Sequence, residues 1–408
     1  MTTPAPVSTR EAVPRAAVHT RVLPGEATVR SRTAAVAAVA GEHAEHTDQS
    51  ATFPQPALAA MRSTGLLGLL VPVDHGGLGG DVSDMVDASI ELGRVDLSVA
   101  MVFAMHCQQV AAIDRFGSAG LRARLLPRVA RGELYLGSVT TESGTGGHLL
   151  SSESPLRGRD DALELDRFAP VVTGGAYADG FLVTMRKPEA SGAHEVSLVY
   201  ADRDQVEVSV AGGWDPLGMR ASHSVPLKLR GVVPGDQVVG RHGAFREVVT
   251  QVFAPMAHLG WSACWLGTAA GALSRVLGVL RSKPGRASYD LSSELLLTGL
   301  SQVRCRLDAV HALVRHTTAV VRAADDLSTP RVQLLLNSLK ITASEQSYAA
   351  VDQLVDLVGM RHGYLKGSPT WLERALRDLR SAPLNYSNDR LHLADGKLAL
   401  LDPEVRLV

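Results

Sequence analysis

Cysteine is scarce in this chain of 408 residues, which contains only three. Cys107, Cys264 and Cys305 lie far apart inside apolar segments, and no pair has the CxxC spacing of a zinc site or a redox motif. This pattern excludes a disulfide framework and a cysteine-based metal site. It predicts buried thiols in a protein of the reducing cytoplasm.

The sequence also lacks an excess of charge of either sign and a long uncharged apolar run. It has 41 basic and 42 acidic residues without a cluster of Lys or Arg, which argues against nucleic acid as a partner. No apolar run stays free of charge long enough to cross a bilayer, and residues 1–27 contain no apolar core of a signal peptide. We therefore expect a cytoplasmic protein with a flexible tail at 1–27 and no membrane partner.

What is present is a change of hydrophobic period along the chain. Apolar residues recur at spacings of three and four over 28–133, which is typical of helices. Region 134–244 instead contains short β-branched runs separated by turns, which predict a small antiparallel sheet or barrel. The helical period returns over 245–408, in segments long enough to form a bundle that continues across a subunit interface. The β-branched runs are 181–184, 196–200, 206–210 and 225–229, and the long helical segments are 254–280, 291–324 and 331–358.

Three turns in the β region carry recognisable motifs. The first, at 139–147, reads V-T-T-E-S-G-T-G-G; the second, at 171–179, reads V-V-T-G-G-A-Y-A-D. The third, at 214–224, reads W-D-P-L-G-M-R-A-S-H-S. Each is a weak signal alone. Their order and spacing, with the helix–sheet–helix sequence of regions, resemble the acyl-CoA dehydrogenase superfamily from about residue 50 to residue 390.

This resemblance implies a mainly helical fold with a central β domain and a C-terminal four-helix bundle, and FAD as the cofactor. Thr140, Thr141 and Thr173 fall on positions that contact the flavin ring in the family, and Arg220 on a flavin-side arginine. Fixed donors there stabilise the negative charge that a reduced flavin gathers. Arg281 and Gly359 fall on positions that reach the flavin pyrophosphate of a neighbouring subunit, which implies a homotetramer or homodimer. No metal site is implied.

The family's catalytic base is missing from the sequence. Its usual glutamate aligns with Tyr386, and the alternative position on the bundle helix aligns with Ala257 and His258. A phenol is a poor base at neutral pH, so either Tyr386 or the nearby Asp389 acts as a non-standard base, or the chemistry differs. His258 is more often a packing residue than a catalyst in such a helix.

Three functions follow from these residues and the resemblance. The leading hypothesis is an FAD-dependent oxidoreductase that dehydrogenates an acyl thioester carried by CoA or a carrier protein. The second is a monooxygenase on the same fold, with flavin reduced by a separate reductase or electron-transfer partner. The third is a flavin-binding homologue without catalytic activity.

Overall fold

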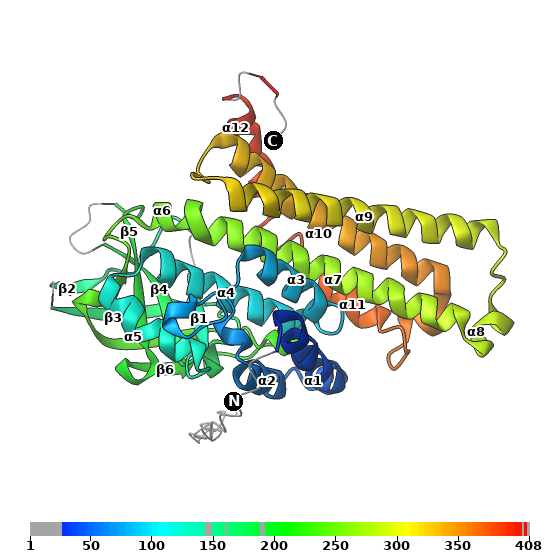
Figure 1. Cartoon of the computed structure of the whole chain (residues 1–408), viewed down its shortest axis with the longest axis horizontal. Coiled ribbons are helices and arrows are strands. Elements are labelled where there is room, and N and C mark those ends of the chain that lie inside the picture. Colours follow the sequence, from blue (N-terminus) through cyan, green and yellow to red (C-terminus); the bar gives the residue numbers. More distant parts are fainter. Residues whose placement is uncertain (1–26, 143–148, 160, 188–191, 402–403, 406–408) are drawn as a thin grey trace, which may run out of the picture.

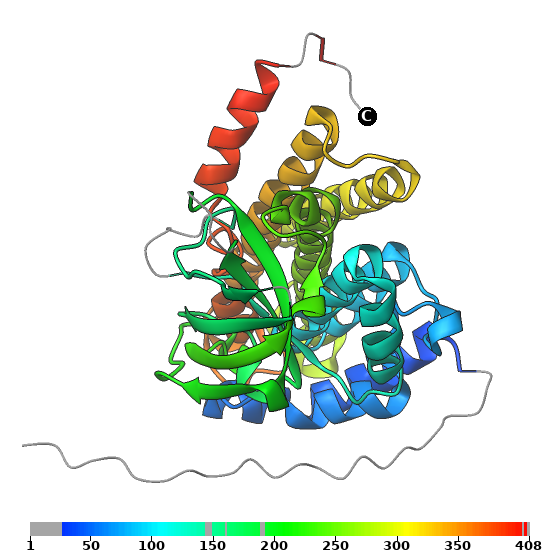
Figure 2. The same ribbon diagram turned by 90° about the vertical axis from the view of Figure 1, so that its left-hand side faces the viewer.

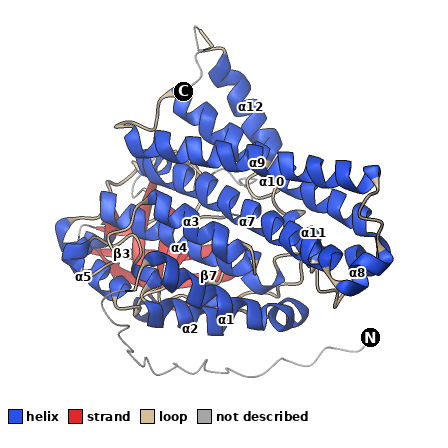
Figure 3. Ribbon diagram, turned by 45° about the vertical axis from the view of Figure 1, so that its right-hand side comes forward, coloured by secondary structure: helices blue, strands red, loops and turns tan. Residues whose placement is uncertain are grey.

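The computed structural model describes residues 27–142, 149–159, 161–187, 192–401 and 404–405. Nearly all of the predicted tail at 1–27 lies outside these residues, as does part of the first motif, at 143–148. Helices come first, then two sheets, then long helices (Figure 1), which confirms a mainly helical fold with a small β domain. Figure 3 shows the strands as a compact block at one end of an otherwise helical molecule.

The N-terminal region is helical. Its helices are α1 (Val29–Ser50), α2 (Gln55–Thr64), α3 (Val82–Gly93), α4 (Leu97–Phe116) and α5 (Ala119–Ala130). Aspartates start two of them. Asp81 accepts hydrogen bonds from the backbone N–H groups of Ser83 and Asp84 at α3, and Asp96 accepts from Val99 at α4. These bonds satisfy backbone donors that have no partner inside the helix.

Two four-stranded sheets form the β domain, in the orders β1-β4-β5-β8 and β2-β3-β7-β6. Their strands are β1 (Leu136–Val139), β2 (Arg157–Arg159), β3 (Ala162–Ala169), β4 (Gly180–Arg186), β5 (Val196–Asp202), β6 (Val206–Val210), β7 (Leu227–Pro234) and β8 (Val238–Val239). The expectation of an antiparallel sheet is wrong for one pair, because β1 runs parallel to β4. A parallel neighbour needs a long connection, which the chain between these two strands provides by forming β2 and β3 of the other sheet.

Helices make up the remainder of the described chain. They are α6 (Phe245–Val248), α7 (Ala254–Arg281), α8 (Lys283–Ser288), α9 (Glu294–Ala323), α10 (Pro330–Gly359), α11 (Leu372–Leu379) and α12 (Asn388–Ala399), and a π-helical turn (Val249–Phe253) joins α6 to α7. Glycines let α7 approach α3 closely. A Cβ atom on Gly267 would lie 2.2 Å from the carbonyl oxygen of Ile90, so a larger side chain would push the two helices apart.

Two stretches are long and apolar enough to span a membrane by length and composition, namely Leu97–Phe116 and Phe245–Arg281. Their most apolar windows are 83% and 67% buried inside the molecule. They therefore have the burial expected of core helices. Two of the three cysteines are buried, Cys107 in α4 and Cys264 in α7. Cys305 on α9 is exposed, so the expectation of three buried thiols is wrong for this residue.

The last helix stands apart from the main body. Figure 2 shows α12, in red, projecting from the main body on the side of the strands. Its attachment to α10 combines the buried side chains of Asn388 and Leu391 with several polar contacts. Asn337 donates to Asp395 over 2.6 Å, and Lys340 donates to Asn388 over 2.7 Å.

Candidate functional site

The first two predicted flavin-binding turns lie side by side. Thr141 follows the end of β1, and its hydroxyl donates to the carbonyl oxygen of Val171 over 2.8 Å. The Val171 N–H donates back to the Thr141 hydroxyl over 3.3 Å. Thr140 lies next to this contact, with its hydroxyl 3.5 Å from that of Ser138.

Hydroxyl groups join the second turn to the third. Ser224 donates to the hydroxyl oxygen of Thr173 over 3.1 Å, and the hydroxyls of Ser222 and Ser224 are 2.8 Å apart. Since the Ser224 proton goes to Thr173, Ser222 is the donor to Ser224. The Thr173 proton is then available to donate to a bound ligand. This directed chain suits a ring that needs a fixed donor near a carbonyl oxygen or nitrogen.

A buried ion pair supports the first turn from behind. Arg167 on β3 is fully buried, and its guanidinium pairs with Glu142 and donates to the carbonyl oxygen of Thr141 over 2.9 Å. Glu142 also accepts from the hydroxyl of Ser154 over 3.0 Å and from the N–H of Glu153 over 2.9 Å. Burial lowers the pKa of Arg167, and the charge of Glu142 opposes this change. The pair fixes the backbone beside Thr140 and Thr141.

Sequence reasoning missed Arg167, although the sequence contains a signal for it. Strand β3 alternates exposed and buried residues, and Leu163, Leu165 and Ala169 are the other buried members. An arginine on the inward face of such a strand requires a buried partner. The alternation of exposed and buried residues along β3 therefore identifies Arg167 as a buried charge that needs a partner.

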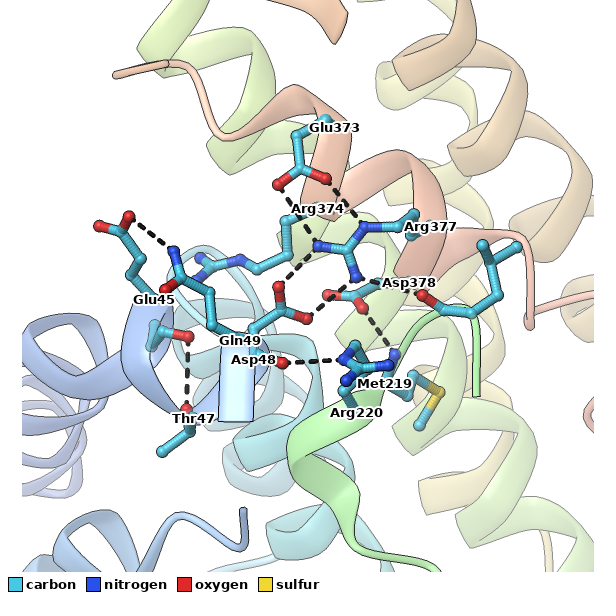
Figure 4. Close-up of polar contacts among 12 residues, drawn as sticks. Glu45, Thr47, Asp48, Gln49, Met219, Arg220, Glu373, Arg374, Arg377 and Asp378 are labelled. Carbon is cyan, nitrogen blue, oxygen red and sulfur yellow. Dashed lines mark hydrogen bonds and ion pairs between the residues drawn. The ribbon is translucent and has the colours of Figure 1, made fainter. Parts of the chain in front are cut away.

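The structure gives Arg220 a supporting position. Its Nε donates to the carbonyl oxygen of Asp48 in α1 over 2.9 Å (Figure 4). Its Nη1 donates to Asp215 and to the carbonyl oxygen of Pro216, each over 3.0 Å. These bonds hold the third turn against the N-terminal helices. A direct contact between Arg220 and the flavin stays a prediction.

A carboxylate network ties α11 to the same turn (Figure 4). Arg377 pairs with Asp48 over 2.6 Å and with Glu373 over 2.8 Å. Asp378 is buried and accepts from the Met219 N–H over 2.6 Å. Burial raises the pKa of Asp378 to about 7, against the opposing charge of Arg374.

Tyr386 lies on the segment that continues from α11. Ser381 in this segment donates to the sulfur of Met219 over 3.0 Å, so the segment borders the third turn. Tyr386 has a left-handed backbone (φ 54°) and a side chain that is 39% exposed, and its carbonyl oxygen accepts from Lys340. Asp389 is exposed in the first turn of α12. Both remain predictions as catalytic groups, and neither is enclosed as a proton-abstracting base usually is.

His258 is buried between α7 and α10. Its Nδ1 lies 3.2 Å from the carbonyl oxygen of Leu336, which makes Nδ1 the protonated nitrogen. Burial, followed by the charge of Lys340, lowers the pKa of His258 to about 4. The ring is therefore neutral and takes part in helix packing, and it is a weak base.

Arg281 and Gly359 lie at the opposite end of the molecule from the three turns. Arg281 is exposed at the end of α7, a helix of 28 residues that rises about 42 Å along its axis. Gly359 ends α10 with φ 66°, next to the contact in which the Tyr289 hydroxyl donates to Val358 over 2.9 Å. Figure 1 shows this end, near α8, far from the strands. The expected contact of these residues with the flavin of a neighbouring subunit stays a prediction.

Metal chemistry finds no support in the part of the chain that the structure describes, where no three His, Cys, Asp or Glu side chains cluster closely enough to hold an ion.

Comparisons with known proteins agree with this geometry. The chain matches the acyl-CoA dehydrogenase N-terminal domain over residues 26–133 and the acyl-CoA dehydrogenase C-terminal domain over residues 259–384, together more than half of its length. It is 24% identical over 347 residues to a dibenzothiophene monooxygenase of Mycolicibacterium goodii, covering 80% of this chain and 82% of the relative.

A probable acyl-CoA dehydrogenase of Mycobacterium leprae is 24% identical over 363 residues, covering 88% of this chain and 90% of the relative. Among solved structures, FMN-bound TdsC from Paenibacillus sp. A11-2 superposes with a TM-score of 0.82 at 22% identity, covering 91% of this chain and 97% of that chain. The two domain matches and the shared fold lead to one conclusion: the chain belongs to the acyl-CoA dehydrogenase superfamily of flavoprotein oxidoreductases.

Proposed function

We propose that the protein is a flavin-dependent monooxygenase that receives its flavin already reduced by a separate reductase. The observation that carries this proposal is the absence of an enclosed carboxylate at either base position of the family, where the chain has Tyr386 and the pair Ala257–His258. Dehydrogenation of a thioester requires a base beside the weakly acidic α-proton. Oxygen insertion has no such requirement.

The other candidate bases fit dehydrogenation poorly. His258 is neutral with a pKa of about 4, and its Nδ1 is engaged with Leu336. Asp389 is exposed on α12, whereas a proton-abstracting base is usually enclosed. A relative of this chain that is named a dibenzothiophene monooxygenase supports the proposed oxygen insertion.

A flavin ring fits the three turns. The hydroxyl chain from Ser222 through Ser224 leaves Thr173 as a directed donor, and Thr141 fixes the neighbouring backbone. Val171 is 41% exposed at the position where the family has a shielding aromatic residue, so one ring face stays open to a small molecule such as oxygen. Bound reduced flavin would supply two electrons to dioxygen, so that one oxygen atom enters the substrate and the other forms water.

We further propose that the flavin is FMN in place of the expected FAD. The ring-side turns lie within one chain, whereas the pyrophosphate-side residues Arg281 and Gly359 are at the far end of the molecule. The segment after Arg281 also carries Lys283 and Pro284 and lacks the family's phenylalanine. A neighbouring structure, TdsC, is FMN-bound. A mononucleotide that exchanges with a reductase needs the ring side of the site more than the adenine side.

The residues of this chain orient and enclose the reactants. Thr173 holds the ring by its hydroxyl, and the Glu142–Arg167 pair keeps the adjoining turn rigid. The Tyr386 segment borders the site, where a backbone N–H at this position can donate to a substrate carbonyl. On α7, Ala254 and Pro255 replace side chains that bind CoA in the family, which favours a substrate without CoA.

The proposal is tested by two reactions with the purified protein. In the first, NADH and a flavin reductase keep FMN reduced under ¹⁸O₂, with indole, dibenzothiophene and butyryl-CoA as probes. We expect a product that carries one ¹⁸O atom by mass spectrometry. In the second, the oxidised flavoprotein is titrated with butyryl-CoA and an acyl-carrier thioester without oxygen, and we expect the flavin band to persist. Bleaching by a thioester would establish a dehydrogenase, and inertness in both reactions would indicate a non-catalytic homologue.

A further inference from the structure

A charged side chain lies buried behind the Tyr386 segment. Lys340 in the middle of α10 is 0% exposed, and its Nζ donates to the carbonyl oxygen of Tyr386 over 2.9 Å and to Asn388 Oδ1 over 2.7 Å. Its Nζ also lies 5.6 Å from the centre of the Trp265 ring. These three neighbours come from the Tyr386 segment, from α12 and from α7, so one ammonium group joins three parts of the chain.

Burying an ammonium group is unfavourable unless it is paired, and here its hydrogen bonds go to uncharged oxygens. The charge of Glu345 acts to raise the pKa of Lys340, but Glu345 Oε1 accepts from Asn388 Nδ2 over 3.1 Å. His258 faces Lys340 from α7 and is neutral. Burial lowers the pKa of Lys340 to about 8, so the group still carries its charge at neutral pH.

The hydrogen bond from Lys340 ends on a strained residue. Tyr386 adopts φ 54°, a left-handed conformation that is unfavourable for any residue with a Cβ atom. Tyr386 is also 39% exposed, so the residue is only partly packed against its surroundings. The hydrogen bond from Lys340 to Tyr386 thus joins a buried charge to a residue with an unfavourable backbone conformation. Strain of this kind persists where the surroundings enforce it, and it gathers at functional sites.

We propose that Lys340 is a positioning residue of the site: its ammonium group holds the Tyr386 turn in the left-handed conformation that forms one wall of the substrate space. This role in catalysis rests on the proposed function. The Tyr386 turn borders the third flavin turn through the contact between Ser381 and Met219. Lys340 does not touch Thr141, Thr173 or Ser224. Its loss should therefore impair turnover and leave flavin binding in place.

The experiment compares Lys340→Met with a matched control, Lys397→Met, which removes an exposed lysine from α12. Methionine keeps the length and apolar stem of the side chain and removes its donors. With reduced FMN, oxygen and the probe that turns over, we expect kcat to fall at least tenfold in Lys340→Met. The dissociation constant of FMN, measured by fluorescence quenching, should stay within twofold. The control should match the wild type in both.

A second measurement tests the link to backbone strain. Glycine adopts a left-handed conformation without the Cβ penalty, so Tyr386→Gly removes the need for an enforced turn. We expect Lys340→Met to lower the urea midpoint of unfolding by a smaller amount in the Tyr386→Gly background than in the wild type. Hydrogen exchange of peptides covering 384–390 should quicken in Lys340→Met and stay unchanged in the control.

If Lys340→Met does not fold, Asn388→Ala removes one of the two acceptors, and the same separation of turnover from FMN binding is expected. Equal losses of FMN affinity and turnover, with the same midpoint shift in both backgrounds, would overturn the proposal and make Lys340 a general core residue. Failure of the proposed function would look different. The wild type would then not oxygenate any probe, while the exchange and midpoint measurements would still report on the turn.

Discussion

The buried carboxylate of Asp378 gives the protein a stability that depends on pH in a defined direction. Burial raises the pKa of Asp378 to about 7 in the folded protein, from an ordinary value of 3.8 when the chain is unfolded. Between these two values the folded protein binds a proton that the unfolded chain has released, so stability falls as pH rises through this window. A difference of about three pH units corresponds to about 4 kcal/mol lost by pH 7.

Asp378→Asn isolates this effect. Asparagine has the same shape, and its amide oxygen can accept from the Met219 N–H, but it carries no charge at any pH. Free energies of unfolding measured in urea at pH 4, 5, 6, 7 and 8 should show the variant gaining on the wild type by up to about 4 kcal/mol as pH rises. Asp352→Asn, which changes an exposed aspartate in the same way, serves as the control. Its free energy of unfolding should follow that of the wild type at every pH. A difference between Asp378→Asn and wild type that does not change with pH would refute the raised pKa.

Three further variants test the site. Tyr386→Glu places a carboxylate at the family's base position, so butyryl-CoA should bleach its flavin without oxygen if the pocket still accepts a thioester; a flavin-loaded but unreactive variant is the result expected for a substrate without CoA. Arg281→Ala separates FMN from FAD: with FMN we expect flavin occupancy, read from the ratio of visible to ultraviolet absorbance, to stay unchanged, and a several-fold loss would instead support FAD with a pyrophosphate contact across subunits. Thr173→Val removes the hydroxyl that accepts from Ser224, and the loss of about one hydrogen bond should weaken FMN binding about tenfold in a fluorescence titration. Equal affinity in the valine variant would argue that the ring lies away from Thr173.

Local patterns were sufficient to predict the fold and to select the three turns. The period of the apolar residues located the helical and sheet regions: the expected strand runs 181–184, 196–200 and 206–210 fall within β4, β5 and β6, and the run 225–229 begins two residues before β7. The motifs also chose residues that the structure brings together, because Thr141 contacts Val171 and Thr173 contacts Ser224. Such motifs are readable because each one is a short stretch of chain with its own turn chemistry.

Contacts between residues that are far apart in the chain could not be predicted from the sequence. Lys340 is 46 residues from Tyr386, and nothing in α10 alone shows which carbonyl oxygen its ammonium group meets. The same is true of Asp378 and Met219, which are 159 residues apart. The parallel pairing of β1 with β4 likewise joins residues that are distant in the sequence, such as Leu136 and Gly180. Register between distant strands follows from the assembled core, which a local pattern does not contain.

The mode of attachment of α12 has a consequence for motion. Most helices here are held by apolar faces, whereas α12 is held by Leu391 and by the polar contacts of Asn388 and Asp395 with α10. We therefore expect α12 to open locally at a lower free energy than that needed to unfold the whole protein. Because Asn388 follows Tyr386 by two residues, each detachment of α12 frees one end of the Tyr386 turn. Access to the site would then open and close at the rate at which α12 detaches and reattaches. Temperature would change this rate well below the temperature at which the core unfolds.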